Sequence, residues 1–449
     1  MPPGKPDHCS DQVERPHVLF LNRSFWPDTE ATGQLLTDLA VDLTSQFDVT
    51  VIAGTPNHVD GDEARSAVLS EYRGVKIKRA WHTRFAKHSS VGRLINLFSF
   101  AVSAWMTAHR TKPRPQVFIV ETDPFFLPLV GDRLRRRFNC SSLICYLQDL
   151  YPDIAVAVGK IREGFVTRTL RRILFNVYRR AERVIVLSGD MQQRCVSLGV
   201  PERIVEVVPN WADTDAIVPL KTENPFRRRH EWNDRFVVMY SGNMGLAHEL
   251  DSIIDAAALL RDRTDIVWVF IGDGARRSAL EDRAAASNLS NVRFLPYQPR
   301  STLGESLSAA DVHLVSVRPS ASPCVMPSKL YGILASGTPT IALAEAGSEL
   351  QSVIQTHNVG LTCEPNDSRA LANHVLRLAD DRTSVATLGR NARRLAEVSF
   401  SRKRQTARFA EILFEVLRPE LKANAAARRL PSTDSTTIPP ESTIPVLVD

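Results

Sequence analysis

Residues 236–245 read FVVMYSGNMG, an apolar run that ends in a turn with two glycines. An uninterrupted apolar run of this length is typical of a strand covered on both faces of a parallel sheet. Strand-like runs and helical patterns alternate on both sides of it, which favours an α/β fold with two doubly wound, Rossmann-like domains. The predicted strands are His17–Leu21, Val49–Ala53, Val75–Arg79, Val117–Val120, Ser142–Leu147, Val184–Leu187, Phe236–Tyr240, Val267–Ile271, Val292–Leu295, Val312–Ser316, Thr340–Leu343 and Gly360–Cys363.

The chain has 449 residues, more than one ordinary core accommodates, so two domains with tails are expected. The break is predicted near residues 209–221, where Pro, Asn and Asp accumulate. Both chain ends have the polar composition of disordered tails. The predicted parts are a disordered tail over 1–14, an N-terminal Rossmann-like domain over 15–208, a C-terminal Rossmann-like domain over 209–400, a terminal helix over 401–418 and a disordered tail over 419–449.

Composition predicts a soluble globular protein, with 43% hydrophobic and 24% charged residues. Residues 1–16 have no apolar core of the signal-peptide kind, so we expect a cytoplasmic protein. The apolar stretch 94–106 is interrupted by polar residues and is interpreted as too short to span a bilayer. The six cysteines form no C-x-x-C pair, which fits reduced thiols better than a disulfide framework or a metal site.

Positive charge is concentrated in residues 160–183, which hold eight basic and two acidic residues. Within this segment apolar residues recur every three or four positions from Ile161 through Phe165, Ile173 and Val177 to Ala181. One interpretation is a core helix with a solvated basic face. The other is a surface that meets anionic groups, such as the lipid headgroups on the inner face of the plasma membrane, which the protein would contact peripherally. No nucleic-acid-binding module accompanies the charge, so no nucleic-acid partner is expected.

Glycine-containing turns follow several predicted strands, where backbone N–H groups can approach a phosphate. In the first half, Gly33 and Gln34 follow such a turn, and a helix is predicted to begin near Gly33; ordinary turn chemistry is the alternative. In the second half Ser328 is predicted to cap a short helix, and Lys329 would lie in its first turn. A cation is unfavourable there unless an anion offsets it, although a solvated lysine is the alternative. The candidate nucleotide-site residues of the second half are Gly242, Asn243, Gly245, Gly272, Asp273, Gly274, Ser328, Lys329 and Leu330.

An ordered set of motifs resembles the GT-B glycosyltransferases of family 4, in the branch that builds bacterial exopolysaccharides such as colanic acid and O-antigens. The motifs are PDTEATGQLLTDLA, QDLYPDIA and VVPNWAD in the acceptor half, and SGNMG, FIGDGARR, NVRFLPYQPR, DVHLVSVRP and PSKLYGILASGTP in the donor half. The resemblance implies two Rossmann-like domains facing across a cleft, with the terminal helix crossing back to the first domain. It also implies a nucleotide-diphosphate sugar donor, with UDP favoured, and a glycan or lipid-linked acceptor. The anomeric configuration would be retained, and neither a metal nor another cofactor would be needed.

Carried over by motif, Gly33 would lie against the donor diphosphate or the reacting centre, and Gly242 with Asn243 would face the diphosphate from the other domain. Residues 272–274 would line the nucleotide, and Tyr297 would flank the base.

The chain departs from the family pattern at its charged donor contacts. Asn243 and His248 stand where the family usually has an arginine and a lysine, and Cys324 and Gly332 stand where it has two glutamates. Ribose recognition is therefore unexplained. Arg318 and Lys329 are the cations left to face the diphosphate, where charge grows as the glycosidic bond to phosphate breaks.

Asp149 follows the strand Ser142–Leu147, at a place where a carboxylate could orient or deprotonate an acceptor hydroxyl. A helix-capping role for Asp149 or Asp153 is the alternative. The two D-x-D triplets at 60–62 and 213–215 are interpreted as loop residues and not as a metal motif.

Two other functions remain open at this point. A UDP-sugar epimerase of the same fold would need a cluster of acid/base carboxylates and histidines, which the motifs do not contain. A non-catalytic sugar-nucleotide-binding protein would explain the missing glutamates.

Overall fold

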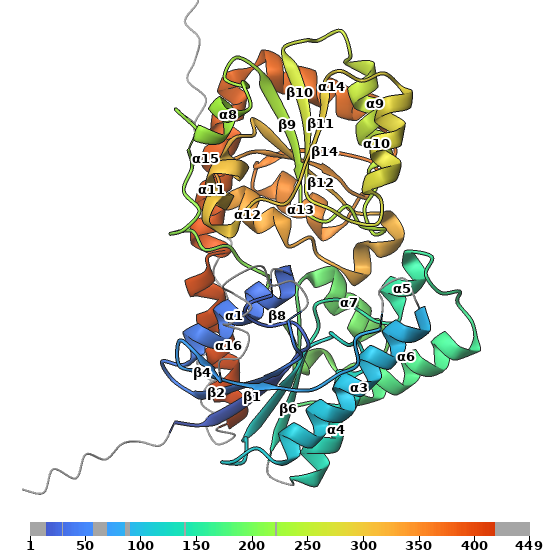
Figure 1. Cartoon of the computed structure of the whole chain (residues 1–449), viewed down its shortest axis with the longest axis vertical. Coiled ribbons are helices and arrows are strands. Elements are labelled where there is room, and N and C mark those ends of the chain that lie inside the picture. Colours follow the sequence, from blue (N-terminus) through green and yellow to red (C-terminus); the bar gives the residue numbers. More distant parts are fainter. Residues whose placement is uncertain are drawn as a thin grey trace, which may run out of the picture.

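The computed structural model describes residues 15–28, 30–56, 70–85, 90–138, 141–220 and 222–417. Its first sheet has the strand order β3-β4-β2-β1-β5-β6-β7-β8 and is parallel except for the short β3–β4 pair (Figure 1). The predicted strands of this half are confirmed to within one or two residues. The strands are β1 His17–Leu21, β2 Asp48–Ala53, β3 Glu71–Tyr72, β4 Val75–Arg79, β5 Val117–Val120, β6 Ser142–Tyr146, β7 Arg183–Val186 and β8 Val205–Val207.

The second sheet is parallel throughout and has the order β11-β10-β9-β12-β13-β14. Its strands are β9 Phe236–Ser241, β10 Ile266–Ile271, β11 Val292–Leu295, β12 Val312–Ser316, β13 Thr340–Leu343 and β14 Gly360–Cys363. Numbered from its first strand, this is the Rossmann order 3-2-1-4-5-6. The two Rossmann-like sheets confirm the predicted α/β fold class.

Helices cover both sheets, as parallel strands require. In the first half they are α1 Ala31–Leu43, α3 Ser90–His109, α4 Leu127–Arg137, α5 Asp153–Ala157, α6 Phe165–Tyr178, α7 Gly189–Ser197 and the 3-10 turn η1 Glu202–Ile204. In the second half they are α8 Pro225–Arg229, α9 Asp251–Leu259, α10 Arg277–Ala286, η2 Arg300–Thr302, α11 Leu303–Ser308, η3 Pro319–Cys324, α12 Lys329–Ala335, α13 Glu349–Thr356, α14 Ser368–Asp380 and α15 Arg382–Ser399.

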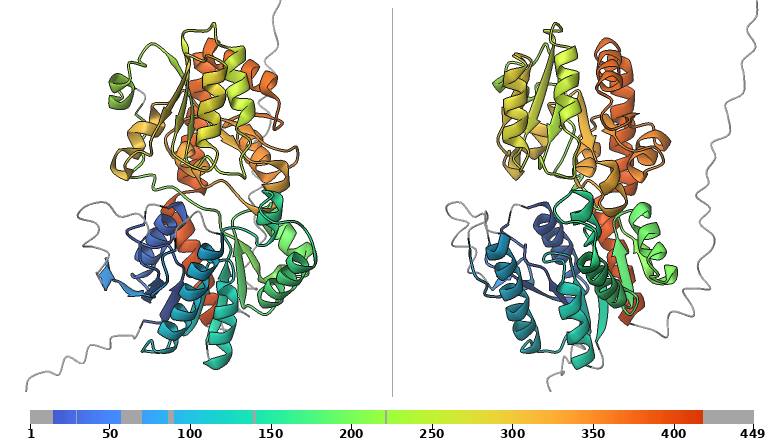
Figure 2. Two further views of the ribbon diagram at one scale, coloured as in Figure 1. Left: turned by 45° about the vertical axis from the view of Figure 1, so that its right-hand side comes forward. Right: turned by 90° about the vertical axis from the view of Figure 1, so that its right-hand side faces the viewer.

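The last helix, α16 (Arg402–Leu417), returns to the first sheet, as both views of Figure 2 show. The ring of its Phe409 lies 6.3 Å from that of Phe20 on β1 and 5.3 Å from that of Tyr146 on β6. At its start, Arg402 is paired with Asp38 at 3.0 Å on α1. The two halves of the chain are thus held together by the C-terminal segment.

The order of the strands reverses between β1 and β5 in the first sheet and between β9 and β12 in the second. In open parallel sheets, ligands bind outside the carboxyl ends of the strands at such switch points. The carboxyl ends of the two sheets face each other in this protein. The evidence is that a segment following a strand of the first sheet contacts a segment following a strand of the second. Asp149 after β6 forms a backbone bridge with Val325, and Leu150 N–H donates to the carbonyl of Cys324 at 3.0 Å.

Several local details differ from the predictions or lie outside them. Strands β3 and β8 were not predicted, because runs of two and three residues carry no periodicity. Helix α1 begins at Ala31, so Gly33 lies inside its first turn. Ser328 has helical backbone angles, and its side chain accepts no capping bond. The predicted tails 1–14 and 419–449 and the triplet 60–62 lie outside the described residues.

Candidate active site

The donor-side loops depend on three glycines with positive φ, which are Gly242 (130°), Gly272 (129°) and Gly274 (146°). Side chains rarely adopt this backbone conformation, and here there is also no room for them. A Cβ on Gly272 would overlap the carbonyl of Gly242, and one on Gly274 would lie 2.6 Å from the carbonyl oxygen of Met244. The loops after β9 and β10 therefore pack backbone to backbone, with the side chains of Lys329 and Tyr297 against Gly242 and Gly272.

Lys329, in the first turn of α12, reaches into this loop pair. Its Nζ lies 3.6 Å from the centre of the Tyr240 ring, and a Cβ on Gly242 would be 3.3 Å from it. Nζ is buried and has no hydrogen-bond partner among the described residues. Burial lowers the pKa of Lys329 to about 7. A buried amine without an acceptor is costly unless a ligand supplies one.

His248 stands where the resemblance placed a lysine, and it is neutral. Its Nδ1–H donates to the carbonyl of Ser316 at 2.6 Å. Burial, together with the nearby charges of Lys329 and Arg318, lowers its pKa to about 3. Arg318 donates to the carbonyl of His248 at 3.2 Å and lies 3.7 Å from the carboxylate of Glu249. Glu249 thus partly offsets the charge of Arg318, whereas no acid is paired with Lys329 in the described chain.

The remaining donor-side candidates divide into exposed and buried residues. The Tyr297 ring is 56% exposed and lies against Gly272. Asp273 is exposed, and its side chain accepts from Gly274 N–H at 2.8 Å. The Asn243 side chain folds back over Gly245, where a Cβ would lie 2.9 Å from its Nδ2. The side chain of Leu330 belongs to the core and is fully buried, so only its backbone could face a ligand.

The facing edge of the first sheet is acidic. Glu121 at the end of β5 is fully buried, with Gln148 Nε2 donating to it at 3.3 Å, and its other oxygen has no partner among the described residues. Burial raises the pKa of Glu121 well above its usual value. Burial and the neighbouring Asp123 raise the pKa of Asp149 to about 6. Asp149 is therefore a carboxylate that can exchange a proton near neutral pH.

Sequence reasoning missed Glu121, Asp123 and Arg23. Arg23 follows β1 and is paired with Asp123 at 3.1 Å, and Ser24 Oγ donates to the same carboxylate at 2.9 Å. The sequence did indicate two of these residues. The tripeptide ETD (121–123) directly follows the predicted strand Val117–Val120, and the ends of parallel strands converge on the ligand crevice.

Gly33 has a clear packing role. A Cβ at this position would lie 3.3 Å from the carbonyl carbon of Ser24 and 3.4 Å from the nitrogen of Phe25. The glycine therefore lets the loop after β1 pack on the first turn of α1. Gln34, the next residue, is partly exposed and its backbone N–H donates to the Glu30 carbonyl.

Contacts between the two halves bring these edges together. Arg300 on η2 is paired with Asp38 on α1 at 2.9 Å. Asp190 accepts from Glu349 N–H at 2.8 Å, and the Glu349 carboxylate accepts in return from the first N–H groups of α7. Each helix N-terminus is thus capped by an acid from the other half, a favourable place for negative charge.

The basic segment 160–183 is only partly free. Arg171 is paired with Asp153 and Glu163, and Asp153, the alternative helix cap, is buried in this cluster. The predicted apolar stripe was wrong in part, because Ile161, Phe165 and Ile173 are exposed. Helix α6 instead buries the face that carries Thr167, Leu174, Phe175, Val177 and Tyr178. Among the described residues, no group of three or more His, Cys, Asp or Glu is arranged to hold a metal ion.

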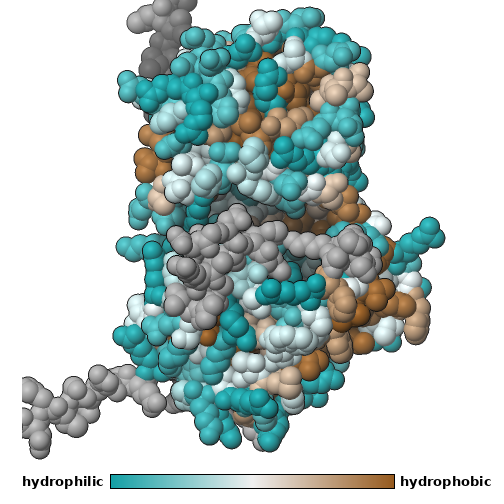
Figure 3. All heavy atoms as spheres, viewed as in Figure 1, coloured by the Kyte–Doolittle hydropathy of each residue, from teal (hydrophilic) through white to brown (hydrophobic). Residues whose placement is uncertain are grey.

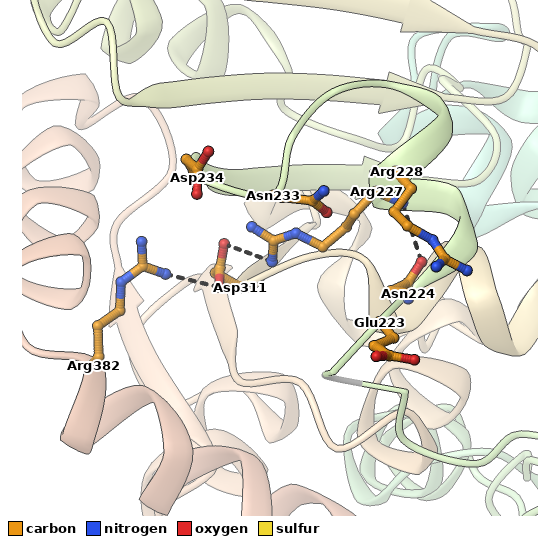
Figure 4. Close-up of a pocket in the computed structure, with 8 residues that line it drawn as sticks. All are labelled: Glu223, Asn224, Arg227, Arg228, Asn233, Asp234, Asp311 and Arg382. Atoms are coloured by element: carbon orange, nitrogen blue, oxygen red, sulfur yellow. Dashed lines mark hydrogen bonds and ion pairs between the residues drawn. The ribbon is translucent and has the colours of Figure 1, made fainter.

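A separate polar hollow of about 630 Å³ lies at the amino ends of β9 and β12, away from the switch points (Figure 4). Its centre is Asp311, which accepts from Arg227 at 3.2 Å and from Arg382 at 2.8 Å. Asp311 also accepts from Val237 N–H at 2.7 Å. These bonds tie α8 and α15 to the sheet, so the hollow has a structural explanation.

Two Rossmann-like sheets with facing switch points, one glycine-rich and cationic and the other acidic, define a GT-B type of enzyme. Comparison with known proteins agrees. The family "Glycosyl transferases group 1" matches residues 222–395, and "Glycosyl transferase 4-like domain" matches residues 32–211. WcaI of Escherichia coli (strain K12), named as a colanic acid biosynthesis glycosyl transferase, is 30% identical over 63% of this chain and 71% of its own length.

The glycosyltransferase WbjE of Pseudomonas aeruginosa is 26% identical, over 71% of this chain and 78% of its own. Among solved structures, Anabaena HepE in complex with UDP and glucose has a TM-score of 0.68 at 18% identity, over 89% of this chain and 99% of that one. The chain belongs to the family 4 GT-B glycosyltransferases, and it is a glycosyltransferase enzyme.

Proposed function

We propose that this enzyme transfers a sugar from a nucleotide diphosphate, with UDP favoured, to a glycan or lipid-linked saccharide in cell-surface polysaccharide synthesis. The observation that carries the donor assignment is the buried Nζ of Lys329, which has no acceptor in the described chain and lies against the Gly242 loop at a switch point. A diphosphate placed there would supply the missing acceptor. That HepE is described in complex with UDP supports the choice of base.

In this proposal the Lys329 ammonium stabilises the negative charge that grows on the departing diphosphate. The guanidinium of Arg318 is a second positive charge that stabilises the same group. Preorganised groups of this kind are usually the largest single contribution to such a reaction. Asp149 orients the acceptor hydroxyl and accepts its proton, since its raised pKa suits a base near neutral pH. Retention at the anomeric carbon and independence from metal ions complete the proposal. They rest on the family resemblance, and activity that survives EDTA would support the second.

The location proposed is the cytoplasm, peripherally at the inner face of the plasma membrane. The name of WcaI, which refers to colanic acid biosynthesis, supports a role in an exported polysaccharide.

The test is a thermal-shift panel of UDP, GDP, ADP, dTDP and CMP on the wild type and on Lys329→Ala. A ligand at 100 times its Kd stabilises the folded state by about 2.7 kcal/mol, which is readily measured. We expect one nucleoside diphosphate to stabilise the wild type and the variant to lose that response. A panel without any response, with and without added Mn²⁺, would overturn the donor site.

A further inference from the structure

Helix α3 carries apolar side chains on two faces, and only one of them packs on the sheet. Phe100, Ala104 and Ala108 are buried on the inner face. A helix on the surface of a soluble protein normally turns polar residues outward. Here residues three, four or seven apart form an exposed apolar stripe of Val91, Leu94, Ile95, Phe98, Val102, Trp105 and Met106. The helix is also longer than the predicted stretch 94–106, and residues 91–109 have the length and composition of a membrane span with only 28% buried.

A second exposed apolar group lies at the start of α6, where Phe165 is 81% and Val166 is 76% exposed. Helix α4 contacts both α3 and α6 and lies between them. Figure 3 shows an apolar surface on the right of the lower half, where Figure 1 places α3, α5 and α6. We call the exposed apolar residues of α3 and of the α6 start the α3–α6 face. An exposed apolar surface of this size marks a contact site.

Positive charge borders the α3–α6 face. The exposed basic residues of its border are Arg93, Lys160, Arg162, Arg168 and Arg172. None of these five forms an ion pair within the described ranges, in contrast to Arg171, Arg180 and Arg183 nearby, and Arg168 interacts with Glu163 only through its charge. Apolar side chains ringed by unpaired cations complement an anionic bilayer. A second copy of the chain would bring like charges together, which disfavours self-association.

A row of aromatic rings leads from this face to the acidic edge of the site. The ring of Phe98 lies 6.1 Å from that of Phe126, which lies 5.0 Å from that of Phe125. Phe125 stacks on Tyr151 at 5.3 Å, two residues after Asp149. Phe125, Phe126 and Tyr151 are each half-buried. We call these four rings the aromatic row.

Two loops place carboxylates and aromatic rings next to each other. The loop after β5 carries Asp123 and then Phe125, and the loop after β6 carries Asp149 and then Tyr151. Aromatic rings can stack on a sugar as well as on an apolar chain, but this row continues away from the carboxylates to Phe98, which is 67% exposed within the apolar stripe of α3. An acceptor with an apolar chain would place the chain along the rings and its polar head at the carboxylates.

We propose that the α3–α6 face seats on an anionic bilayer, and that the aromatic row guides the apolar chain of a lipid-linked acceptor to Asp149. The assignment of the acceptor rests on the proposed function, whereas the membrane contact does not. The free cations of the border meet the lipid headgroups or the phosphate of the acceptor, and the two experiments below separate these sources.

The first experiment is sedimentation of the full chain with vesicles of phosphatidylglycerol and phosphatidylethanolamine, or of phosphatidylcholine alone. The wild type should bind the anionic vesicles preferentially, and Phe165→Ser/Val166→Ser should weaken binding at least about tenfold because two large apolar side chains no longer enter the bilayer. The matched control is Leu259→Ser/Val398→Ser, which removes two apolar residues of 53% and 57% exposure on other helices. Equal binding to both vesicle types, or equal loss in the control, would overturn the membrane face.

The second experiment measures binding of farnesyl phosphate and of inorganic phosphate in solution. The wild type should bind farnesyl phosphate, and Phe98→Ser should weaken that binding at least about fivefold, since one aromatic contact is lost. UDP stabilisation, measured in parallel, should be unchanged. If inorganic phosphate binds as tightly, or if Phe98→Ser has no effect, the aromatic row is overturned. If UDP binds neither the wild type nor any variant, the proposed function is wrong. The vesicle experiment would still show whether the α3–α6 face binds a membrane.

Discussion

The six strands around the switch point, β4-β2-β1-β5-β6-β7 in the first sheet and β11-β10-β9-β12-β13-β14 in the second, have the same order, but one switch point carries an amine and the other carries carboxyl groups. Between β9 and β12 the loops present bare glycine backbone and the buried amine of Lys329. Between β1 and β5 they present Glu121 and Asp123, with Asp149 beside them after β6. Because the topology is the same, the difference arises only from the loops. It suits an anionic donor on one side and an acceptor hydroxyl on the other, so substitutions on the two sides should have separable effects.

The acidic side should show the largest effect. Asp149→Asn removes the group that accepts the acceptor proton, so kcat should fall by about 10²–10⁴-fold. UDP stabilisation should be unchanged, because the lesion lies on the acceptor side. In the wild type kcat/KM should fall as the pH drops below about 6, where Asp149 gains a proton.

Asp153→Asn is the control for that variant. Asp153 is paired with Arg171 and Arg194, so its loss should lower the melting temperature and leave kcat largely intact. A wild-type rate in Asp149→Asn would remove the residue from the mechanism.

On the cationic side, Lys329→Met should lower kcat by about 10²–10³-fold, the usual loss for one preorganised contact to developing charge. It should also abolish stabilisation by UDP. Because the unfolded chain binds more protons than the folded one between pH 7 and 10.5, the wild type should gain stability with rising pH through this window. Thermal unfolding at pH 7 and pH 9 should show this gain in the wild type and a smaller one in Lys329→Met.

A smaller effect is expected from the glycine backbone. Gly274→Ala forces a Cβ to within 2.6 Å of the Met244 carbonyl oxygen at a φ of 146°, so it should reduce the free energy of unfolding by about 1–3 kcal/mol. Gly347→Ala is the control, since φ is also positive there but nothing lies within 4 Å. Denaturant unfolding should show a larger loss in the free energy of unfolding for Gly274→Ala than for Gly347→Ala. Equal losses would mean that the close packing of the loops contributes nothing to stability.

The smallest effect concerns the link between the two sides. Arg300→Ala removes the Arg300–Asp38 ion pair, but Arg300 is 51% exposed and Asp38 keeps Arg402 as a partner. An exposed pair of this kind contributes at most about 1 kcal/mol. KM for the donor should therefore rise less than about fivefold. A much larger rise would show that this contact controls how the two halves meet.

The strands could be predicted closely from sequence because several buried parallel strands are uninterrupted apolar runs, as in β5 and β10. The glycine loops could be predicted for the same reason, since each follows such a run directly. The burial of Lys329 could not, because it depends on Tyr240 and Gly242, which are almost ninety residues away in the chain. The buried face of α6 was also beyond reach, since its apolar residues lie on more than one side and only packing against the sheet selects among them.

If the donor diphosphate binds at Lys329, its binding should change the protonation of this side chain, and proton uptake measures that change. At pH 8 the free enzyme holds Lys329 mostly neutral, since its pKa is about 7. A bound diphosphate favours the charged form, so UDP binding should draw close to one proton from solution. Calorimetric titration of UDP in buffers of different ionisation enthalpy measures this number. We predict uptake approaching one proton in the wild type and none in Lys329→Met; binding without uptake, or equal uptake in both, would contradict the account.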